Sequence, residues 1–152
     1  MRRLLLCAAA VSALASCSAD PAGRYTVIAS STGDAQAAAQ LISAYRVSRG
    51  LSPVTVDPRL NRAAEHQARA VAVTGKLDHG NFGGRMTQYG VMGHAAENLS
   101  AGYDTVGQAV TSWKTSRHHN ANLLMPEARS IGLARADAKG GYGRYWALVL
   151  GP

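Results

Sequence analysis

The sequence has little cysteine, and neither of its two cysteines lies in the part of the chain that would form a folded domain. Cys7 and Cys17 both fall within the first 17 of the 152 residues. Residues 18–152 therefore have no thiol for a disulfide, a zinc–thiolate site or a cysteine nucleophile. The stability of this part must come from its hydrophobic core, which a chain of about 130 residues can provide.

Long hydrophobic runs and clusters of basic residues are also missing. The apolar run over residues 4–14 is too short to span a bilayer as a helix. The formal net charge of +7 falls to +5 once Arg2 and Arg3 are left out, and the other basic residues are spread along the chain. We therefore expect no nucleic-acid partner, because proteins that bind nucleic acids carry a clustered basic patch or a known binding motif.

The first 17 residues predict an export signal. Arg2 and Arg3 precede the short apolar run, which ends in Leu-Ala-Ser-Cys at residues 14–17. This ending resembles a bacterial lipobox, which implies cleavage before Cys17 and a diacylglycerol group on its sulfur. The alternative is an ordinary secretory signal in which Cys17 is incidental. The first interpretation predicts an exported protein that the lipid on Cys17 holds at a membrane of the cell envelope, and in a Gram-negative cell at the outer membrane or in the periplasm.

A single domain is expected over residues 34–152. Residues 18–33 are rich in serine, alanine and glycine and predict a flexible tether, although residues 25–28 could make a short strand. Apolar residues recur at helical spacing in three segments, which are residues 34–49, the segment from Asp57-Pro58 to Gly75, and the segment from Thr105 to Trp113.

Strands are expected at the end of the chain. Residues 130–136 and 144–150 read as strands, and the glycine-rich link between them predicts an antiparallel hairpin. Residues 76–102 have weak periodicity, so we expect a short helix at residues 85–89 and loops elsewhere. Helices followed by strands predict an α+β fold in which the helices pack against a small sheet.

Two histidines and a glutamate are the main candidates for chemistry. His79 and Glu97 lie in the predicted loop, and His119 follows the third helix. Two neutral imidazoles and a carboxylate can bind a divalent metal and leave an open position for water. Without a metal, the same groups can transfer protons in a cleft. The spacing matches no short ligand motif, so histidines that only bond the backbone are an equally good interpretation.

Three other residues are weaker candidates. His94 stands three residues before Glu97, but in a loop this spacing does not place both side chains on one face. His66 lies inside the second predicted helix, where we expect a solvated side chain. Ser116 precedes His119 by about one helical turn, but no Gly-x-Ser-x-Gly motif is present, so a serine nucleophile is not expected.

Several motifs occur together in a distinctive order. Asp78-His79 is followed by Glu97-Asn98-Leu99 and then by Trp-x-x-Ser-x-x-His-x-x-Asn-Leu-Leu at residues 113–124. Asp57-Pro58 precedes them, and the chain ends with Tyr-Trp-Ala at residues 145–147. In this order the segments resemble the CAP superfamily (cysteine-rich secretory proteins, antigen 5 and pathogenesis-related 1) in its bacterial, cysteine-free form. The resemblance extends over about residues 34–151.

The resemblance implies an α-β-α sandwich, with helices on both sides of a small antiparallel sheet and a central cleft. It implies that His79 and His119 face each other in the cleft and take a divalent metal such as zinc. Glu97 would be a carboxylate beside them. Counting back from Asn122 in the His-x-x-Asn motif selects His119 and not His118, which would point outward.

The chain also departs from the family pattern. Many animal and plant members place a second glutamate three residues after the tryptophan, and this position is Ser116 here. The resemblance does not fix a function. One hypothesis is an envelope-anchored binding module whose cleft holds a lipid, a glycan or a peptide. The alternative is a hydrolase of peptide or cell-wall bonds, in which a metal acidifies a water molecule and Glu97 is the catalytic base. The missing glutamate favours binding, and whether the protein is an enzyme stays open.

Overall fold

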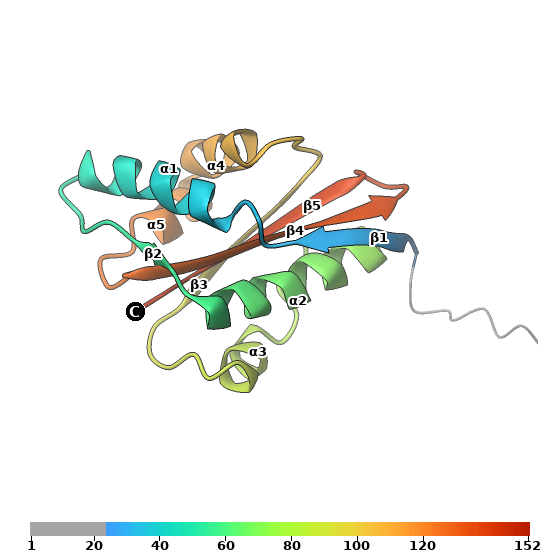
Figure 1. Ribbon diagram of the computed structural model, residues 1–152, viewed down its shortest axis with the longest axis horizontal. Helices are drawn as coiled ribbons and strands as arrows, with labels where there is room; N and C mark the ends of the chain where they lie inside the picture. The colour runs from blue at the N-terminus through green and yellow to red at the C-terminus, as the bar shows by residue number, and fades with distance from the viewer. Residues whose placement is uncertain (1–23) are drawn as a thin grey trace, which may run out of the picture.

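The computed structural model describes residues 24–152, which fold into three layers with a sheet between two groups of helices (Figure 1). The predicted signal at residues 1–17, with Cys17, lies outside the described residues, as do residues 18–23 of the predicted tether. No helix of the described part combines the length and the hydrophobicity that a membrane span requires. The layers confirm the predicted α-β-α sandwich.

The sheet has five strands and is mostly antiparallel. The strands are β1 (Thr26–Ser31), β2 (Thr55–Val56), β3 (Ala96–Ala101), β4 (Ser130–Lys139) and β5 (Arg144–Gly151). Four of them follow the order β1–β4–β5–β3 with antiparallel pairing, and the short β2 runs parallel to the start of β4. The hairpin of β4 and β5 was predicted. β3 pairs with β5 alone, so it forms one edge of the sheet.

Two strands lie where the sequence predicted a tether and a loop. β1 pairs with the end of β4, and Val27 packs against the core on one face of the sheet, so the domain includes residues 26–31 of the predicted tether. β3 lies in the predicted loop and carries Glu97. Strands therefore precede the last helices, and the predicted order of helices followed by strands is wrong.

Helices cover both faces of the sheet (Figure 1). One face carries α1 (Ala35–Val47), α4 (Val106–Thr115) and α5 (Arg117–Leu123), and the other carries α2 (Pro58–Thr74) and α3 (Phe82–Gln88). The three main predicted helices are confirmed. The short helix expected at residues 85–89 begins earlier, at Phe82, and α5 was not predicted.

Two helices begin at the capping residues that the sequence indicated. The Asp57 carboxylate accepts a bond from the Arg59 amide at 2.7 Å, with Pro58 at the first helical position. The Thr105 hydroxyl accepts from the Gln108 amide at 3.3 Å, and the Gln108 side chain accepts from the Thr105 amide at 3.1 Å. These bonds satisfy amide groups that have no partner inside the first helical turn.

β5 connects the two halves of the core. Its side chains alternate between the faces of the sheet, as they must in a strand. Trp146, Leu148 and Leu150 join the core beneath α1 and α4, whereas Tyr145, Ala147 and Val149 join the core beneath α2. Each of these six residues is 1% exposed or less. The described residues therefore contain two hydrophobic cores that share one central strand.

α2 lies unusually close to the sheet at Gly132 of β4. A Cβ atom on Gly132 would lie 1.9 Å from the carbonyl carbon of Leu60. Ala63, Ala64 and Ala68 on the same helix are fully buried, so small side chains allow the close packing of the whole helix. Glycine at position 132 is needed for this distance and not for an unusual backbone angle.

Gly132→Ala is expected to destabilise the protein by at least about 2 kcal/mol, because the added methyl group collides with backbone that no rotamer change can move. Gly83 in α3 offers a control, since a Cβ there meets nothing within 4 Å. Gly83→Ala is expected to leave stability unchanged or to raise it by about 0.5 kcal/mol. Urea unfolding of residues 18–152 measures both changes, and equal stabilities for the two variants would contradict the close approach.

Candidate functional site

The candidate site lies at the edge of the sheet formed by β3, between the segment that follows α2 and the helix α5. Glu97 of β3 contacts the first of these flanks, and its neighbour Asn98 contacts the second. The three residues selected from the sequence, His79, Glu97 and His119, therefore belong to one region of the surface. Glu97 lies on a strand and not in a loop, as the sequence had suggested.

The imidazole of His79 is held by the carboxylate of Glu97. Its Nδ1 atom lies 2.8 Å from Oε1 of Glu97. A carboxylate only accepts hydrogen bonds, so Nδ1 carries the proton and donates it. The Nε2 atom of the neutral ring then has a free lone pair. The His79 side chain is 54% exposed while that of Glu97 is 2% exposed, so a buried group fixes the direction of an accessible ring.

The second oxygen of Glu97 is also occupied. It forms a buried ion pair with Arg85 of α3. The Arg85 guanidinium also donates to Gln67 Oε1 at 2.5 Å and to the His79 carbonyl at 3.3 Å. Gln67 of α2 in turn donates to the Asp78 carbonyl. The network fixes both the carboxylate and the backbone on either side of the His79 Cα atom.

α5 holds His119 against the other side of β3. The Asn98 side chain donates to the His119 carbonyl at 3.0 Å. Asn122 donates to the Glu97 carbonyl at 3.2 Å and to Asn98 Oδ1 at 2.9 Å, so it connects α5 to β3. His118 is exposed and His119 is half-buried, as expected from the motif register.

The pKa of His119 lies below its usual value. Burial is the main cause, followed by the charges of His79 and then of His118. A lowered pKa keeps His119 in the neutral form that a metal or a hydrogen-bonded ligand requires.

A hollow of about 270 Å³ adjoins His119. It is lined by the apolar residues Leu77 and Tyr103 and by the hydroxyl-bearing residues Ser100, Ser112 and Ser116, among others. Ser100 is 6% exposed, and its Oγ atom has no hydrogen-bond partner among residues 24–152. A buried hydroxyl without a partner is unfavourable, so this atom is a weak point in the packing next to the hollow.

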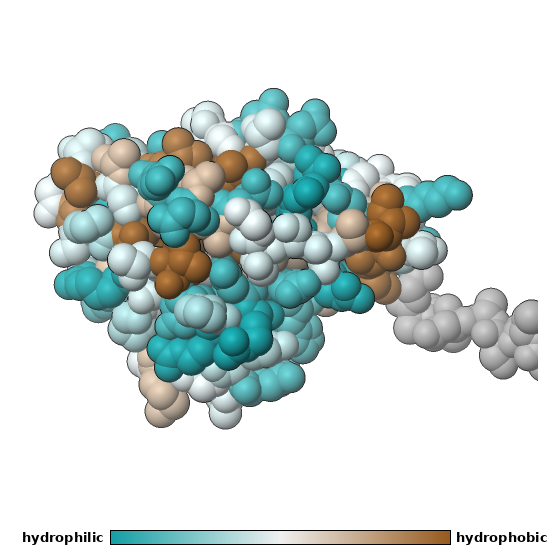
Figure 2. Space-filling model, viewed as in Figure 1, coloured by the Kyte–Doolittle hydropathy of each residue, from teal (hydrophilic) through white to brown (hydrophobic). Residues whose placement is uncertain are grey.

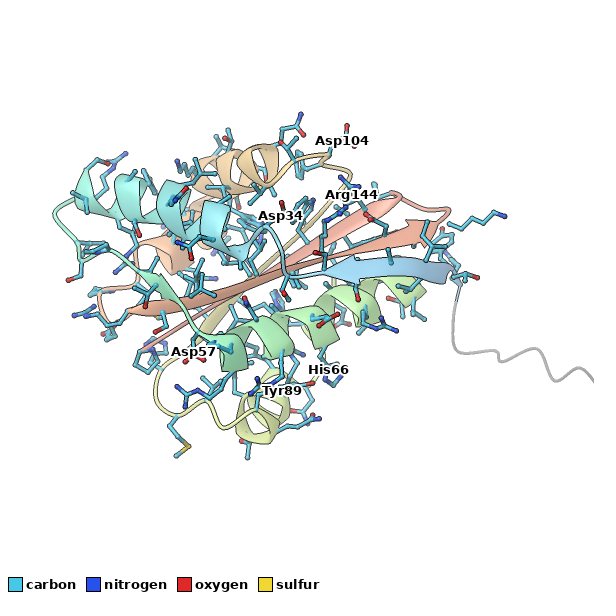
Figure 3. The ribbon with its side chains drawn as sticks, viewed as in Figure 1. Asp34, Asp57, His66, Tyr89, Asp104 and Arg144 are labelled. Carbon is cyan, nitrogen blue, oxygen red and sulfur yellow. The ribbon has the colours of Figure 1, made fainter. Side chains whose placement is uncertain are left out.

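The three weaker candidates either lie away from Glu97 and His119 or form no side-chain hydrogen bond with them in the described residues. The His94 side chain is 71% exposed and lies 4.0 Å from Glu127, so it does not form a pair with Glu97. His66 lies beside Tyr89 between α2 and α3 (Figure 3). Ser116 lines the same hollow as His119, but no hydrogen bond between the two side chains occurs in the described part of the chain.

Comparison with known proteins identifies the family. Residues 39–150 match the sequence profile of the cysteine-rich secretory protein (CAP) family. The chain belongs to this family. The matched range covers most of both cores and every element that contributes to the candidate site.

The CAP domain is also similar to individual bacterial proteins. It is 27% identical over 105 residues to the uncharacterized protein YkwD of Bacillus subtilis, a match that covers 65% of this chain and 41% of YkwD. An outer surface protein of Borrelia burgdorferi has a similar structure, with a TM-score of 0.70, 20% identity, and coverage of 85% of this chain and 97% of that protein. An extracellular Bacillus anthracis protein containing an SCP domain gives a TM-score of 0.67 at 20% identity and covers 76% of this chain and 39% of its own. These two structural matches support the fold alone.

Two residues of this CAP domain, His79 and His119, are candidate metal ligands. Residues 24–152 contain no group of three or more His, Cys, Asp or Glu side chains that could hold a metal ion. His79 nevertheless fits a metal-binding role, because histidines that bind metals usually donate their second N–H to a carboxylate. His79 Nε2 and the His119 ring would be the ligands, and solvent or a bound molecule would complete the coordination.

Sequence reasoning missed Arg85 and Gln67. Arg85 lies in the predicted short helix, and Gln67 lies in the second predicted helix between candidate core residues. Burial of an arginine requires an anionic or carbonyl partner, but the sequence gives no sign that this partner is Glu97. Helical spacing could have placed Gln67 on the buried face of α2, because it stands between Ala64 and Val71 on that face.

His119 is expected to titrate below 6.5 in an NMR titration of its ring protons, because burial and the nearby histidines disfavour its charged form. The unfolded chain then binds more protons than the folded chain as pH falls below about 6.5, so stability decreases in that range. His79→Ala removes a neighbouring charge and some burial, and it should raise the pKa of His119. His66→Ala is the control and should leave the pKa of His119 unchanged. A His119 pKa at or above 6.5 would contradict the geometry.

Proposed function

We propose that this CAP domain is an exported binding module that the lipid on Cys17 anchors to a membrane of the cell envelope, with its ligand bound in the cleft between His79 and His119. The similarity to an outer surface protein and to an extracellular protein supports export. The lipobox-like ending at Cys17 supports the anchor. The bond from His79 Nδ1 to Glu97 carries the proposal for the cleft, because it leaves Nε2 of an accessible ring available to bind.

A divalent metal such as zinc is the proposed partner of the two rings. His79 would bind through Nε2, and His119 would bind in the neutral form that its lowered pKa favours. A bound metal would supply a positive charge that attracts a carboxylate, phosphate or hydroxyl oxygen of the ligand. Glu97 would not touch the metal, and instead it would orient His79 and increase the basicity of that ring.

The hollow beside His119 favours a small polar ligand over a lipid chain. Three serines are among the residues that line it, namely Ser100, Ser112 and Ser116. Leu77 and Tyr103 supply apolar surface. Hydroxyl groups next to apolar walls suit a sugar ring or a short polar segment of a peptide, because such ligands combine polar edges with apolar faces. A glycan is therefore the favoured ligand class, and a peptide is the second choice.

The contacts of Glu97 favour binding over hydrolysis. A catalytic base must reach a water molecule with a free oxygen. Both oxygens of Glu97 are already bound, one by His79 and one by Arg85, and the side chain is 2% exposed. The second glutamate of many family members is replaced by Ser116, so no other carboxylate compensates at that position.

Zinc is expected to bind to residues 18–152, and His79→Ala and His119→Ala should each lower its affinity about tenfold or more, because each removes one of two protein ligands. His118→Ala is the matched control, since His118 is exposed on the same helix as His119, and it should bind zinc as the wild type does. Competition with a fluorescent zinc chelator measures the affinities. Wild-type affinity in both of the first two variants would remove the metal from the proposal.

Glu97→Gln is expected to lower zinc affinity about 10- to 100-fold without direct loss of a ligand, because the amide no longer fixes the ring of His79 as a carboxylate does. The glutamine oxygen can still accept one of the two original bonds, so the fold should persist, and urea unfolding should verify this. Glu127→Gln is the control, since this carboxylate is 59% exposed and lies near His94. Equal zinc affinity in the two variants would mean that Glu97 does not position His79.

A further inference from the structure

A second concave surface lies outside the cleft, between α2, α3 and β1. It has a volume of about 830 Å³ and shares no residue with the hollow beside His119. We call it the α2 groove and define it by Arg62, His66, Arg69, Ala70, Val73 and Tyr89. In Figure 2 hydrophilic side chains gather over α2 and α3, in the lower part of the molecule.

The α2 groove presents cationic groups in a row. Arg62, His66 and Arg69 stand at positions i, i+4 and i+7 of α2, so they lie along one face of the helix. Within residues 24–152 neither arginine has a carboxylate within ion-pair distance. Arg69 donates only to the Ser30 hydroxyl, at 3.1 Å. Glu65 also lines the groove and accepts a bond from the same hydroxyl at 2.7 Å. The lining of the groove therefore contains one carboxylate and two guanidinium groups.

Apolar groups form another part of the groove. Val27, Ala70 and Val73 line it together with the ring of Tyr89. Tyr89 packs edge-on against His66, with 5.9 Å between the ring centres, and its hydroxyl lies 3.2 Å from His66 Nδ1 (Figure 3). The α2 groove therefore offers both positive charge and apolar surface, which suits an anionic amphiphile better than a free anion.

The place of the α2 groove in the chain indicates where such a ligand would come from. Val27 belongs to β1, the first described element, and Cys17 stands nine residues before Thr26. Nine residues span at most about 30 Å. If Cys17 carries a lipid, as proposed above, the groove lies within reach of the membrane surface. A guanidinium group matches the geometry of a phosphate group and binds it through paired hydrogen bonds.

We propose that the α2 groove binds the headgroup phosphate of an anionic phospholipid, with Arg62 and Arg69 as the phosphate ligands and the apolar residues against the start of the acyl chains. Contact at this groove turns α2 and α3 toward the bilayer. The cleft belongs to the opposite edge of the sheet from β1, because β3 and β1 are the two ends of the strand order.

Co-sedimentation of residues 18–152 with vesicles tests this proposal without any lipid anchor. Binding to an equimolar mixture of phosphatidylglycerol and phosphatidylcholine, and not to phosphatidylcholine alone, is expected. Arg62→Gln combined with Arg69→Gln should weaken the binding about tenfold or more. Arg49→Gln combined with Lys114→Gln is the charge-matched control, because these residues flank Tyr45 on the opposite layer, and it should change the binding by less than about threefold.

A second pair of variants adds a negative charge. Ala70→Glu places it in the α2 groove, and Ala37→Glu places it at an exposed position of α1. Only the first should abolish binding, and thermal unfolding should show that both remain folded. Equal losses within either matched pair would overturn the proposal, because net charge alone would then explain the binding. Absence of binding by the wild type would overturn it as well. None of these results depends on lipidation of Cys17 or on zinc, so failure here leaves the proposed cleft untouched.

Discussion

Two consecutive side chains of the edge strand β3 bond the two flanks of the candidate site. Glu97 and Asn98 are adjacent in β3, so their side chains point to opposite faces of the sheet. Glu97 binds His79 on the flank that follows α2, and Asn98 binds the carbonyl of His119 on α5. The two segments that carry these histidines are therefore bonded to side chains on opposite faces of one strand. A shift of β3 by one residue against β5 would exchange the two faces and disconnect both flanks.

A buried arginine, Arg46, holds the end of α5 against α1. Arg46 of α1 is 0% exposed, and its guanidinium donates to four backbone carbonyls, those of Ser52, Leu123, Met125 and Ala128. Burial and, second to it, the charge of Arg129 lower the pKa of Arg46. Three of the four carbonyls belong to the end of α5 and the chain that follows it, so this one side chain connects α1 to the segment that carries His119. The buried charge of Arg46 is thus stabilised by carbonyl oxygens, where an ordinary ion pair would use a carboxylate.

The sequence predicted the elements whose signals are local and missed those whose stability depends on distant partners. Caps at Asp57 and Thr105 act within one helical turn, so both helix starts could be read directly. β1 and β3 have neither a long apolar run nor regular alternation, because one lies at each edge of the sheet and β3 carries polar side chains on both of its faces. Their pairing partners are β4 and β5, which follow much later in the chain. α5 was missed for a related reason, since its polar sequence shows no hydrophobic stripe apart from Leu123.

The sequence selected the candidate residues but not the contacts that hold them. The family motifs selected His79, Glu97 and His119; in the structure the His79 ring bonds Glu97 of β3, and the His119 backbone bonds Asn98 of the same strand. A motif carries no information about Arg85, which comes from another helix and neutralises the charge of Glu97. With Arg85 in place, both carboxylate oxygens of Glu97 are bound by neighbouring side chains. What the cleft offers to a ligand is then imidazole nitrogen and serine hydroxyl, in a position where a carboxylate of the wider family is absent. Recognition by hydrogen bonds, with or without a metal, follows more directly from this chemistry than proton transfer by a carboxylate.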